Sequence, residues 1–233
     1  ALVAVVFSAC TQAADNTATS SLVYKDPPKN IIFFVGDGMG YNHMLLANYF
    51  EYGHEKAQPY EQEDWVQFAL ATFPAVTRYR DGEMTFGTGY NPRAAWQDPE
   101  YASKDYTDSG AGGTSLSTGV KTYYNTIGIG IYGDTLLHIS QAAKALGKSI
   151  GVVSSVPLTH ATPASFVVHN RDRRNYEELA HYMLFHSRID LIMAPGHPDH
   201  DDDGRQAENN GRYIGGREIW TQLLANDGRT EFV

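Results

Sequence analysis

Apolar residues along the chain form short continuous runs that alternate with segments of helical character. Four short runs have the composition of strands: 29–35, 75–79, 149–154 and 189–193. Four segments are expected to form helices: 41–52, 110–120, 136–145 and 175–185. Residues 53–105 are polar, aromatic and interrupted by Gly and Pro, which is typical of a long excursion over the surface. Strands alternating with helices predict an α/β fold with a mostly parallel sheet.

Composition narrows the class of protein. The chain has 233 residues, of which 42% are hydrophobic and 19% charged, so disordered and fibrous classes are excluded. The formal net charge is −9 and no basic stripe is present, so nucleic acid is not an expected partner. Because the negative net charge of the chain repels anions, an anionic substrate would need a local site that attracts it. The single cysteine, Cys10, excludes an internal disulfide framework and a cysteine zinc cage.

The first residues indicate export. Residues 1–10 form an apolar run that is too short to span a membrane but suits the hydrophobic part of a secretory signal. The small residues before Cys10 resemble a bacterial lipoprotein cleavage site, which predicts a periplasmic protein anchored to the membrane through a lipidated Cys10. Ordinary signal cleavage near Ala13 is the alternative. Residues 11–21 are rich in Thr, Ser and Ala and are expected to be a flexible tether, so 1–21 is assigned to signal and tether.

Asp37 is the first candidate for a functional residue. It follows the first predicted strand, at the edge where open α/β sheets bind ligands. It lies in Gly-Asp-Gly-Met-Gly (36–40), whose glycines allow a sharp turn and the close approach of an ion. The carboxylate suits Mg²⁺ or Zn²⁺. The alternative is a tight turn in which Asp37 only caps the next helix.

Ser109 is the second candidate. Its hydroxyl is expected at a helix start, among residues too small to block access (110–114). A helix N-terminus favours phosphate and a developing alkoxide, and a metal ion would activate the hydroxyl further. Simple helix capping by Ser109 or Asp108 is the alternative. The spacing fits neither a P-loop nor the G-x-S-x-G elbow of esterases.

Two later segments offer metal-binding and anion-binding groups. His160 and Thr162 would point to one site if the backbone is extended, which Pro163 favours. Both are suitable metal ligands or partners of ligands. In the charged run 171–174, an arginine could bind a tetrahedral oxyanion with two hydrogen bonds. Taken alone, the first segment is better explained by a turn and the second by a solvated charge run.

Taken together, the segments indicate a function far more specifically than any one of them does alone. Four of them occur in the order and approximate spacing of alkaline phosphatases: 36–40, 107–111, 117–122 and 159–164. The sequence resembles that family from about Asn30 to about Ile192. The resemblance implies a three-layer αβα fold around a central, mostly parallel sheet. Residues 22–233 would then be the N-terminal part of the catalytic domain, incomplete at its C-terminus.

The resemblance also implies a role for each matched residue. Ser109 aligns with the nucleophile that becomes phosphorylated and that also contacts metal. Asp37 aligns with the carboxylate between the second zinc and the magnesium, and Thr162 with the magnesium-site hydroxyl. Arg173 matches the arginine that grips phosphate oxygens, and Asp108 the aspartate that orients this arginine.

The implied reaction is the hydrolysis of phosphate monoesters through a phosphoserine, with two Zn²⁺ and one Mg²⁺ as cofactors. His160 stands where some bacterial members have aspartate and the animal enzymes have histidine, so the identity of the third metal is left open. The family's remaining His, Asp and Glu ligands come from sequence well downstream, which makes this chain the expected N-terminal part of a longer enzyme. Full activity of the 233 residues alone is therefore doubtful.

Two other functions remain as alternatives. Phosphodiesterases and sulfatases of the same superfamily also use a metal-bound nucleophile. A non-catalytic module that binds an oxyanion or a metal is the second alternative. The resemblance leaves a homodimer open.

Overall fold

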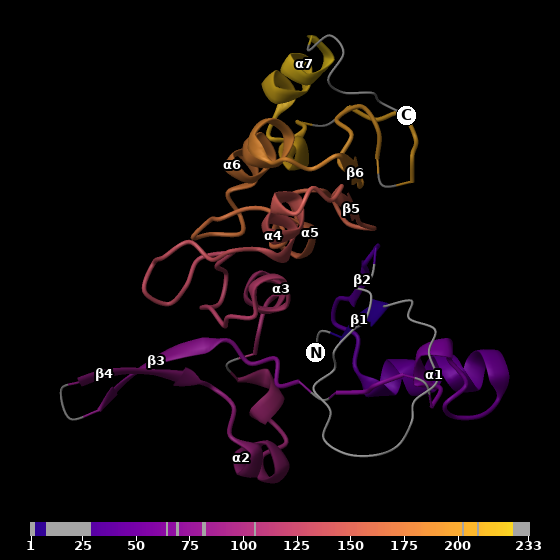
Figure 1. Cartoon of the computed structure of the whole chain (residues 1–233), viewed down its shortest axis with the longest axis vertical. Coiled ribbons are helices and arrows are strands. Elements are labelled where there is room, and N and C mark those ends of the chain that lie inside the picture. Colours follow the sequence, from indigo (N-terminus) through magenta and orange to yellow (C-terminus); the bar gives the residue numbers. More distant parts are fainter. Residues whose placement is uncertain are drawn as a thin grey trace. The chain divides into compact units, whose positions relative to one another are not determined.

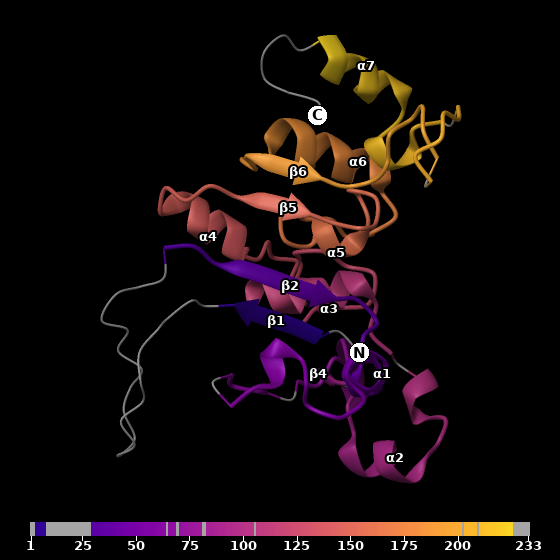
Figure 2. The same ribbon diagram turned by 90° about the vertical axis from the view of Figure 1, so that its right-hand side faces the viewer.

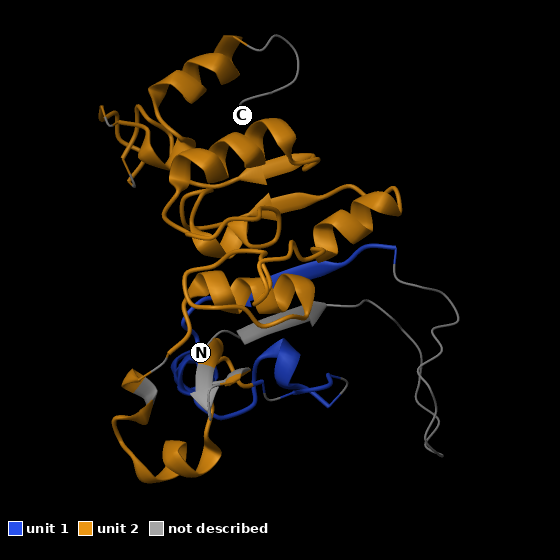
Figure 3. Ribbon diagram, turned by 90° about the vertical axis from the view of Figure 1, so that its left-hand side faces the viewer, with its two compact units in different colours: residues 1–70 blue, residues 71–233 orange. Residues whose placement is uncertain are grey.

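The computed structural model describes residues 29–63, 65–68, 70–80, 83–104, 106–201, 203–208 and 210–225, and the backbone of strand β1 (Val3–Phe7). The chain divides into two compact units, residues 1–70 (unit 1) and 71–233 (unit 2), which Figure 3 distinguishes by colour. The predicted signal and tether, Cys10 included, lie outside the described residues apart from β1. No helix among the described residues is long and apolar enough to cross a membrane.

Unit 1 contains a strand pair, a helix and a short 3-10 turn. Strand β2 (Ile32–Gly36) pairs antiparallel with β1, with Val3 opposite Gly36. Helix α1 (Tyr41–Tyr52) has the predicted bounds, and the turn η1 (Pro59–Glu61) follows. The expectation that this first strand is buried on both faces is wrong here, since Ile32 is 58% and Phe34 52% exposed. Pairing with β1 provides backbone hydrogen bonds along one edge of β2, while the side chains of Ile32 and Phe34 remain exposed to solvent.

Unit 2 opens with a hairpin and two short helices. Strand β3 (Ala75–Arg80) confirms the predicted strand, and it pairs antiparallel with β4 (Glu83–Thr88), which was not predicted (Figure 1). Helix α2 (Pro92–Gln97) and the 3-10 turn η2 (Tyr101–Ser103) follow. The excursion expected over 53–105 is therefore partly regular structure.

The rest of unit 2 is an alternation of helices and strands. Its elements are α3 (Ser109–Thr118), α4 (Ile139–Ala145), β5 (Gly151–Val153), α5 (Ala161–Ala164), α6 (Tyr176–His181), the π-helical segment η3 (Tyr182–His186), β6 (Leu191–Met193), the 3-10 turn η4 (Arg212–Ile214) and α7 (Arg217–Ala225). Strands β5 and β6 lie side by side in parallel, with Gly151 opposite Leu191 (Figure 2). This parallel pair, joined through helices, confirms the α/β class.

The predicted elements of this region are present with shifted ends. The helix expected over 110–120 is α3, and the one over 136–145 begins later, at Ile139. The helix expected over 175–185 changes from α-helical to π-helical at Tyr182. Both strands are shorter than their apolar runs. Gly151–Val153 pairs with Leu191–Met193, and backbone hydrogen bonds of Ile150 and Ser154 to the partner segment extend the contact by one residue at each end.

The core of unit 2 gathers between the strand pair and its helices. Val152 and Ile192, the central residues of β5 and β6, pack against it, while Val153 and Met193 are largely exposed. The buried apolar side chains come mainly from α5, α6, α7 and the loops between them: Ile127, Leu158, Ala161, Ala164, Val167, Val168, Leu179, Met183, Ile214, Ile219, Trp220 and Leu223. This core fixes α5 and the chain that follows it, which carry several of the predicted site residues.

Candidate active site

Ser109 occupies the first position of α3, and Asp108 is the N-cap. The Asp108 carboxylate accepts the backbone N–H groups of Gly110 at 3.0 Å and Ala111 at 3.1 Å, which is the standard way to satisfy free donors at a helix start. A Cβ at Gly110 would lie 2.8 Å from Asp108 Oδ2, so this close cap requires glycine there. Of the two residues considered as caps, the helix uses Asp108.

The same carboxylate holds Arg173. Arg173 Nη1 donates to Asp108 Oδ2 at 3.0 Å, and the side chains are 24% and 6% exposed respectively. Asn125 joins the two, because its N–H donates to Asp108 Oδ1 at 3.0 Å and its carbonyl accepts the Arg173 N–H at 2.9 Å. A nearly buried ion pair with these additional hydrogen bonds keeps the guanidinium next to the start of α3.

Arg174 is engaged elsewhere, and Arg171 is exposed. Arg174 grips Asp172 with two hydrogen bonds, at 3.0 and 3.1 Å, which holds the pKa of that carboxyl below its usual range. Asp172 also accepts from Asn125 Nδ2 at 2.8 Å. Of these arginines, Arg173 is the one that the structure brings to Asp108. Asn125 was not a sequence candidate, although its φ of +73° marks a position where few other residues are tolerated.

Thr162 lies in helix α5, so the extended backbone expected at Thr162 from the following Pro163 is wrong, whereas His160 at the N-cap is extended. Pro163 is the third residue of α5, in the first helical turn, where the missing N–H needs no partner. Residues two apart then lie on different faces, so His160 and Thr162 are not aligned as a strand would align them. Thr162 is half-buried, and its carbonyl accepts from Ser165 Oγ at 2.9 Å.

Helices α3 and α5 pack closely against each other. Ser117 Oγ in α3 donates to the carbonyl of Ser165, just after α5, at 2.5 Å. A Cβ at Gly113 would come 2.0 Å from Ser165 Oγ, so the small residues of α3 allow this approach. The helices that carry Ser109 and Thr162 are therefore neighbours.

His160, at the N-cap position of α5, lies in an aromatic cluster. Its ring centroid is 5.1 Å from that of Tyr213, edge to face, and 6.3 Å from that of Tyr176. The Arg212 guanidinium lies 4.7 Å from the centre of the Tyr176 ring, a cation–π contact. Local sequence does not indicate these partners, because each lies far along the chain from His160 and their positions depend on how α6 and η4 pack.

Asp37 belongs to unit 1, whereas Ser109, Thr162 and Arg173 belong to unit 2. It follows β2 in a turn where Gly38 has a φ of +71°. A Cβ at Gly36 would come 2.9 Å from the side chain of Met39, so glycine is also favoured at that position. The turn expected after the first strand is present.

The candidate ligands fit a metal site only in part. Asp37, Ser109 and Thr162 offer oxygen atoms, the donors that Mg²⁺ prefers, whereas structural and catalytic zinc sites draw mostly on His and Cys. Within the described part of the chain, no group of three or more His, Cys, Asp or Glu side chains is placed to hold an ion. Each of these residues is therefore suited to supply an oxygen ligand to a metal site that needs further ligands.

The start of α3 combines a serine, the positive end of a helix and a guanidinium held by a nearly buried carboxylate. Such a combination can bind a tetrahedral oxyanion and stabilise negative charge that develops beside the serine. Together, fold and site define an α/β protein in which a serine at a helix start lies next to a paired arginine. The family model of alkaline phosphatase matches residues 28–229, and the chain belongs to that family.

Individual relatives support this family assignment. Alkaline phosphatase 3 of Bacillus subtilis (strain 168) is 30% identical over 186 residues, which are 78% of this chain and 35% of that protein. Alkaline phosphatase of Escherichia coli (strain K12) is 33% identical over 150 residues, 64% of this chain and 27% of that protein. The crystal structure of a cold-active alkaline phosphatase from Shewanella sp. matches with a TM-score of 0.50 and 30% identity, over 82% of this chain and 38% of that one. The chain spans about a third of the length of these relatives.

Replacing Arg173 with alanine is expected to weaken phosphate binding without emptying the metal sites. Loss of hydrogen bonds from a guanidinium to a charged oxyanion should raise the inhibition constant of inorganic phosphate about 10- to 100-fold in the natural, metal-loaded protein. Metal content, measured by atomic emission, should not change. Arg174→Ala is the matched control, since that side chain grips Asp172. If Arg174→Ala weakens phosphate binding and Arg173→Ala does not, the assignment of the phosphate-binding arginine is wrong.

Proposed function

We propose that this chain carries the nucleophile and phosphate-binding arginine of a metal-dependent phosphate monoester hydrolase, an alkaline phosphatase that acts through a phosphoserine at Ser109. One observation carries the proposal: the Asp108 carboxylate caps the helix that begins at Ser109 and also binds Arg173. A single nearly buried side chain thereby fixes the serine's helix and the cation next to it. Family membership supports the reaction class.

The proposed reaction uses these positions. Ser109 Oγ attacks the phosphorus, a Ser109 Oγ–P bond forms, and the bond to the leaving alcohol breaks in line. Arg173 donates hydrogen bonds to the phosphoryl oxygens in both the ground state and the transition state, and the N-terminus of α3 adds its partial positive charge. Water then cleaves the phosphoserine, which regenerates the serine and releases phosphate. Bound metal ions supply positive charge that favours the ionised Ser109 hydroxyl and offsets charge on the leaving oxygen.

The proposed cofactors are two Zn²⁺ and one Mg²⁺. Asp37, Ser109 and Thr162 are the ligands assigned within this chain, and His160 leaves the identity of the third metal open. Because the chain spans about a third of the length of its relatives, the proposal assigns the remaining ligands to sequence outside these 233 residues. Export to the periplasm, lipidation at Cys10 and a homodimer remain proposals from the sequence.

Relative rates on three ester classes test the function. The natural protein, loaded with Zn²⁺ and Mg²⁺ at alkaline pH, should hydrolyse a chromogenic phosphate monoester much faster than the corresponding phosphodiester or sulfate ester. Faster turnover of the diester or the sulfate would assign the chain to another activity of the superfamily. Absence of turnover on all three, with metals bound, would favour the binding-module alternative.

A further inference from the structure

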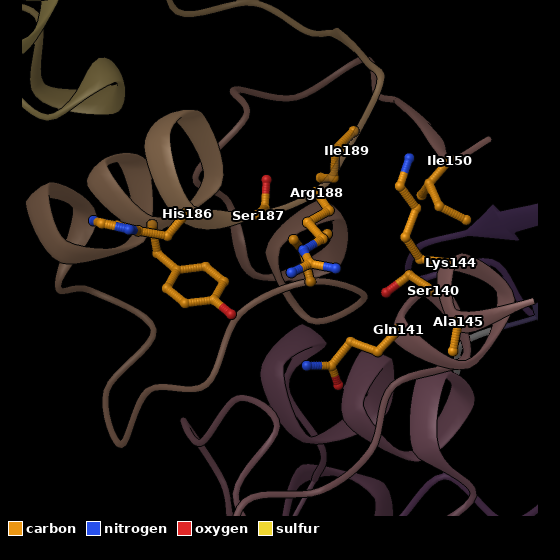
Figure 4. A pocket seen from close by; sticks show the side chains of 11 residues that line it. Ser140, Gln141, Lys144, Ala145, Ile150, His186, Ser187, Arg188 and Ile189 are labelled. Carbon is orange, nitrogen blue, oxygen red and sulfur yellow. The ribbon is translucent and has the colours of Figure 1, made fainter. Parts of the chain in front are cut away.

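A pocket separate from the candidate active site lies at the opposite end of the strand pair. It has a volume of about 280 Å³ and lies between α4 and η3 (Figure 4). Its wall includes Ile150, immediately before β5, and Ile189, shortly before β6. Thr162 and His160 follow β5 instead. The pocket is therefore at the amino ends of the parallel strands, away from the carboxyl ends that lead to the predicted site residues.

Arg188 gives the pocket its charge. Figure 4 shows its side chain reaching between the residues of α4 and those of η3. Arg188 is exposed and makes no ion pair with a carboxylate in the described part of the chain. Lys144, on the same wall, is neutralised by Asp190, whose two oxygens lie 2.7 and 2.6 Å from Nζ. Asp190 also accepts the N–H of Ile150 at 2.7 Å, and this backbone hydrogen bond helps to hold the ion pair in place at the pocket wall.

Two further donors face the same space. Gln141 uses its Oε1 to accept the N–H of His138 at 3.0 Å, while its amide N–H groups have no partner in the described part of the chain. The hydroxyl of Tyr182, also a lining residue, likewise has none there. The hydroxyl hydrogens of Ser140 and Ser187 are not available to a ligand, because each is donated to a backbone carbonyl. None of the lining residues is a carboxylate.

The rest of the lining is apolar. Ala145, Ile150, Val167 and Ile189 supply aliphatic surface beside the donors. A ligand suited to this wall has an oxyanion at one end and an apolar body at the other. The chain carries a formal net charge of −9, so an anion would be held here by local groups and not by the overall field.

We propose that this pocket is a second binding site, which takes a small organic oxyanion. The oxyanion lies on the Arg188 guanidinium, with hydrogen bonds from the Gln141 amide and the Tyr182 hydroxyl, and the body of the ligand lies against the aliphatic wall. A phosphonate and a carboxylate share this chemistry. The site is distinct from the Ser109 centre and does not depend on the proposed function.

Calorimetric titration of the 233-residue chain with phenylphosphonate and with benzoate tests the proposal. Arg188→Gln should raise the dissociation constant about tenfold or more, since it removes a charge-assisted pair, and Tyr182→Phe should raise it less, since it removes one hydroxyl. Arg205→Gln is the matched control, because Arg205 is an exposed arginine paired with Asp203 outside the pocket. It should leave the affinity unchanged.

Each other outcome overturns the proposal. Weaker binding in Arg173→Ala with unchanged binding in Arg188→Gln would place the ligand at the start of α3. Equal losses in Arg188→Gln and Arg205→Gln would mean that only surface charge attracts the ligand. Absence of heat with both probes up to millimolar concentration would show that the pocket is not a binding site. The relative affinities of the two probes decide between phosphonate and carboxylate.

Discussion

Replacing Ser109 with alanine should reduce kcat for phosphate monoesters by a factor on the order of 10⁴ or more in the natural, metal-loaded protein. The hydroxyl is the proposed attacking group, and the neighbouring Asp108 carboxylate is engaged by the N–H groups of α3 and by Arg173. Helix α3 should form normally, since its cap is the Asp108 carboxylate and not Ser109. Steady-state kinetics, with circular dichroism to verify folding, measure the effect.

Ser115→Ala is the matched control for this change. Ser115 lies in the same helix, and its hydroxyl donates to the backbone carbonyl of Ala111 at 3.0 Å. Its removal should leave kcat within a few-fold of the natural value. A similar loss in both variants would mean that the hydroxyls of α3 act structurally, and near-normal turnover by Ser109→Ala would show that another group is the nucleophile.

Acidification should destabilise unit 2 through His138. This side chain is fully buried, its ring stacks on that of His169 at 4.4 Å, and neither ring nitrogen has a hydrogen-bond partner in the described part of the chain. Burial, with a smaller contribution from the charge of His169, lowers the pKa of His138 from its usual 6.5 to about 4. Between these pH values the unfolded chain binds the proton more readily than the folded one.

The contribution of buried, neutral His138 to the free energy of unfolding is therefore fully present above pH 6.5 and is lost as the pH falls toward 4. The difference corresponds to about 3 kcal/mol of unfolding free energy from this residue. Urea unfolding of the natural chain and of His138→Leu at pH 7.5 and pH 4.5 measures it. The variant should lose less stability on acidification than the natural chain, while His181→Gln, an exposed histidine, should match the natural chain. Equal acid losses in the natural chain and His138→Leu would contradict this account.

Sequence patterns predicted those elements whose signals are local. Helix α1 has the predicted bounds. Helix α3 begins at the predicted position because its capping residue, Asp108, and Gly110, whose lack of a Cβ admits this close cap, lie two residues apart in the sequence. Strand β4 was missed although Asp81-Gly82, a sequence favourable to hairpin turns, precedes it. Helix α5 was missed because a proline usually pushes the preceding residue toward extended backbone, and packing against α3 overrides that preference.

The candidate site was predictable as a set of segments and not as a set of contacts. Resemblance to a family selected Arg173 from the charged run 171–174, whereas its pairing with Asp108 requires two segments far apart in sequence to meet. The part played by Asn125 depends on a backbone conformation that local sequence does not specify. The aromatic neighbours of His160 are set by the packing of α6 against η4, which only the folded chain defines.

The most direct measurement is to locate the phosphoryl group on the enzyme. The natural, metal-loaded protein would be mixed with a phosphate monoester, quenched in acid during turnover, digested and analysed by mass spectrometry. The account predicts one phosphorylated peptide, with the phosphoryl group on Ser109. A phosphoryl group on any other residue, or turnover without a trapped phosphopeptide under several quench times, would contradict the assignment of Ser109 as the nucleophile.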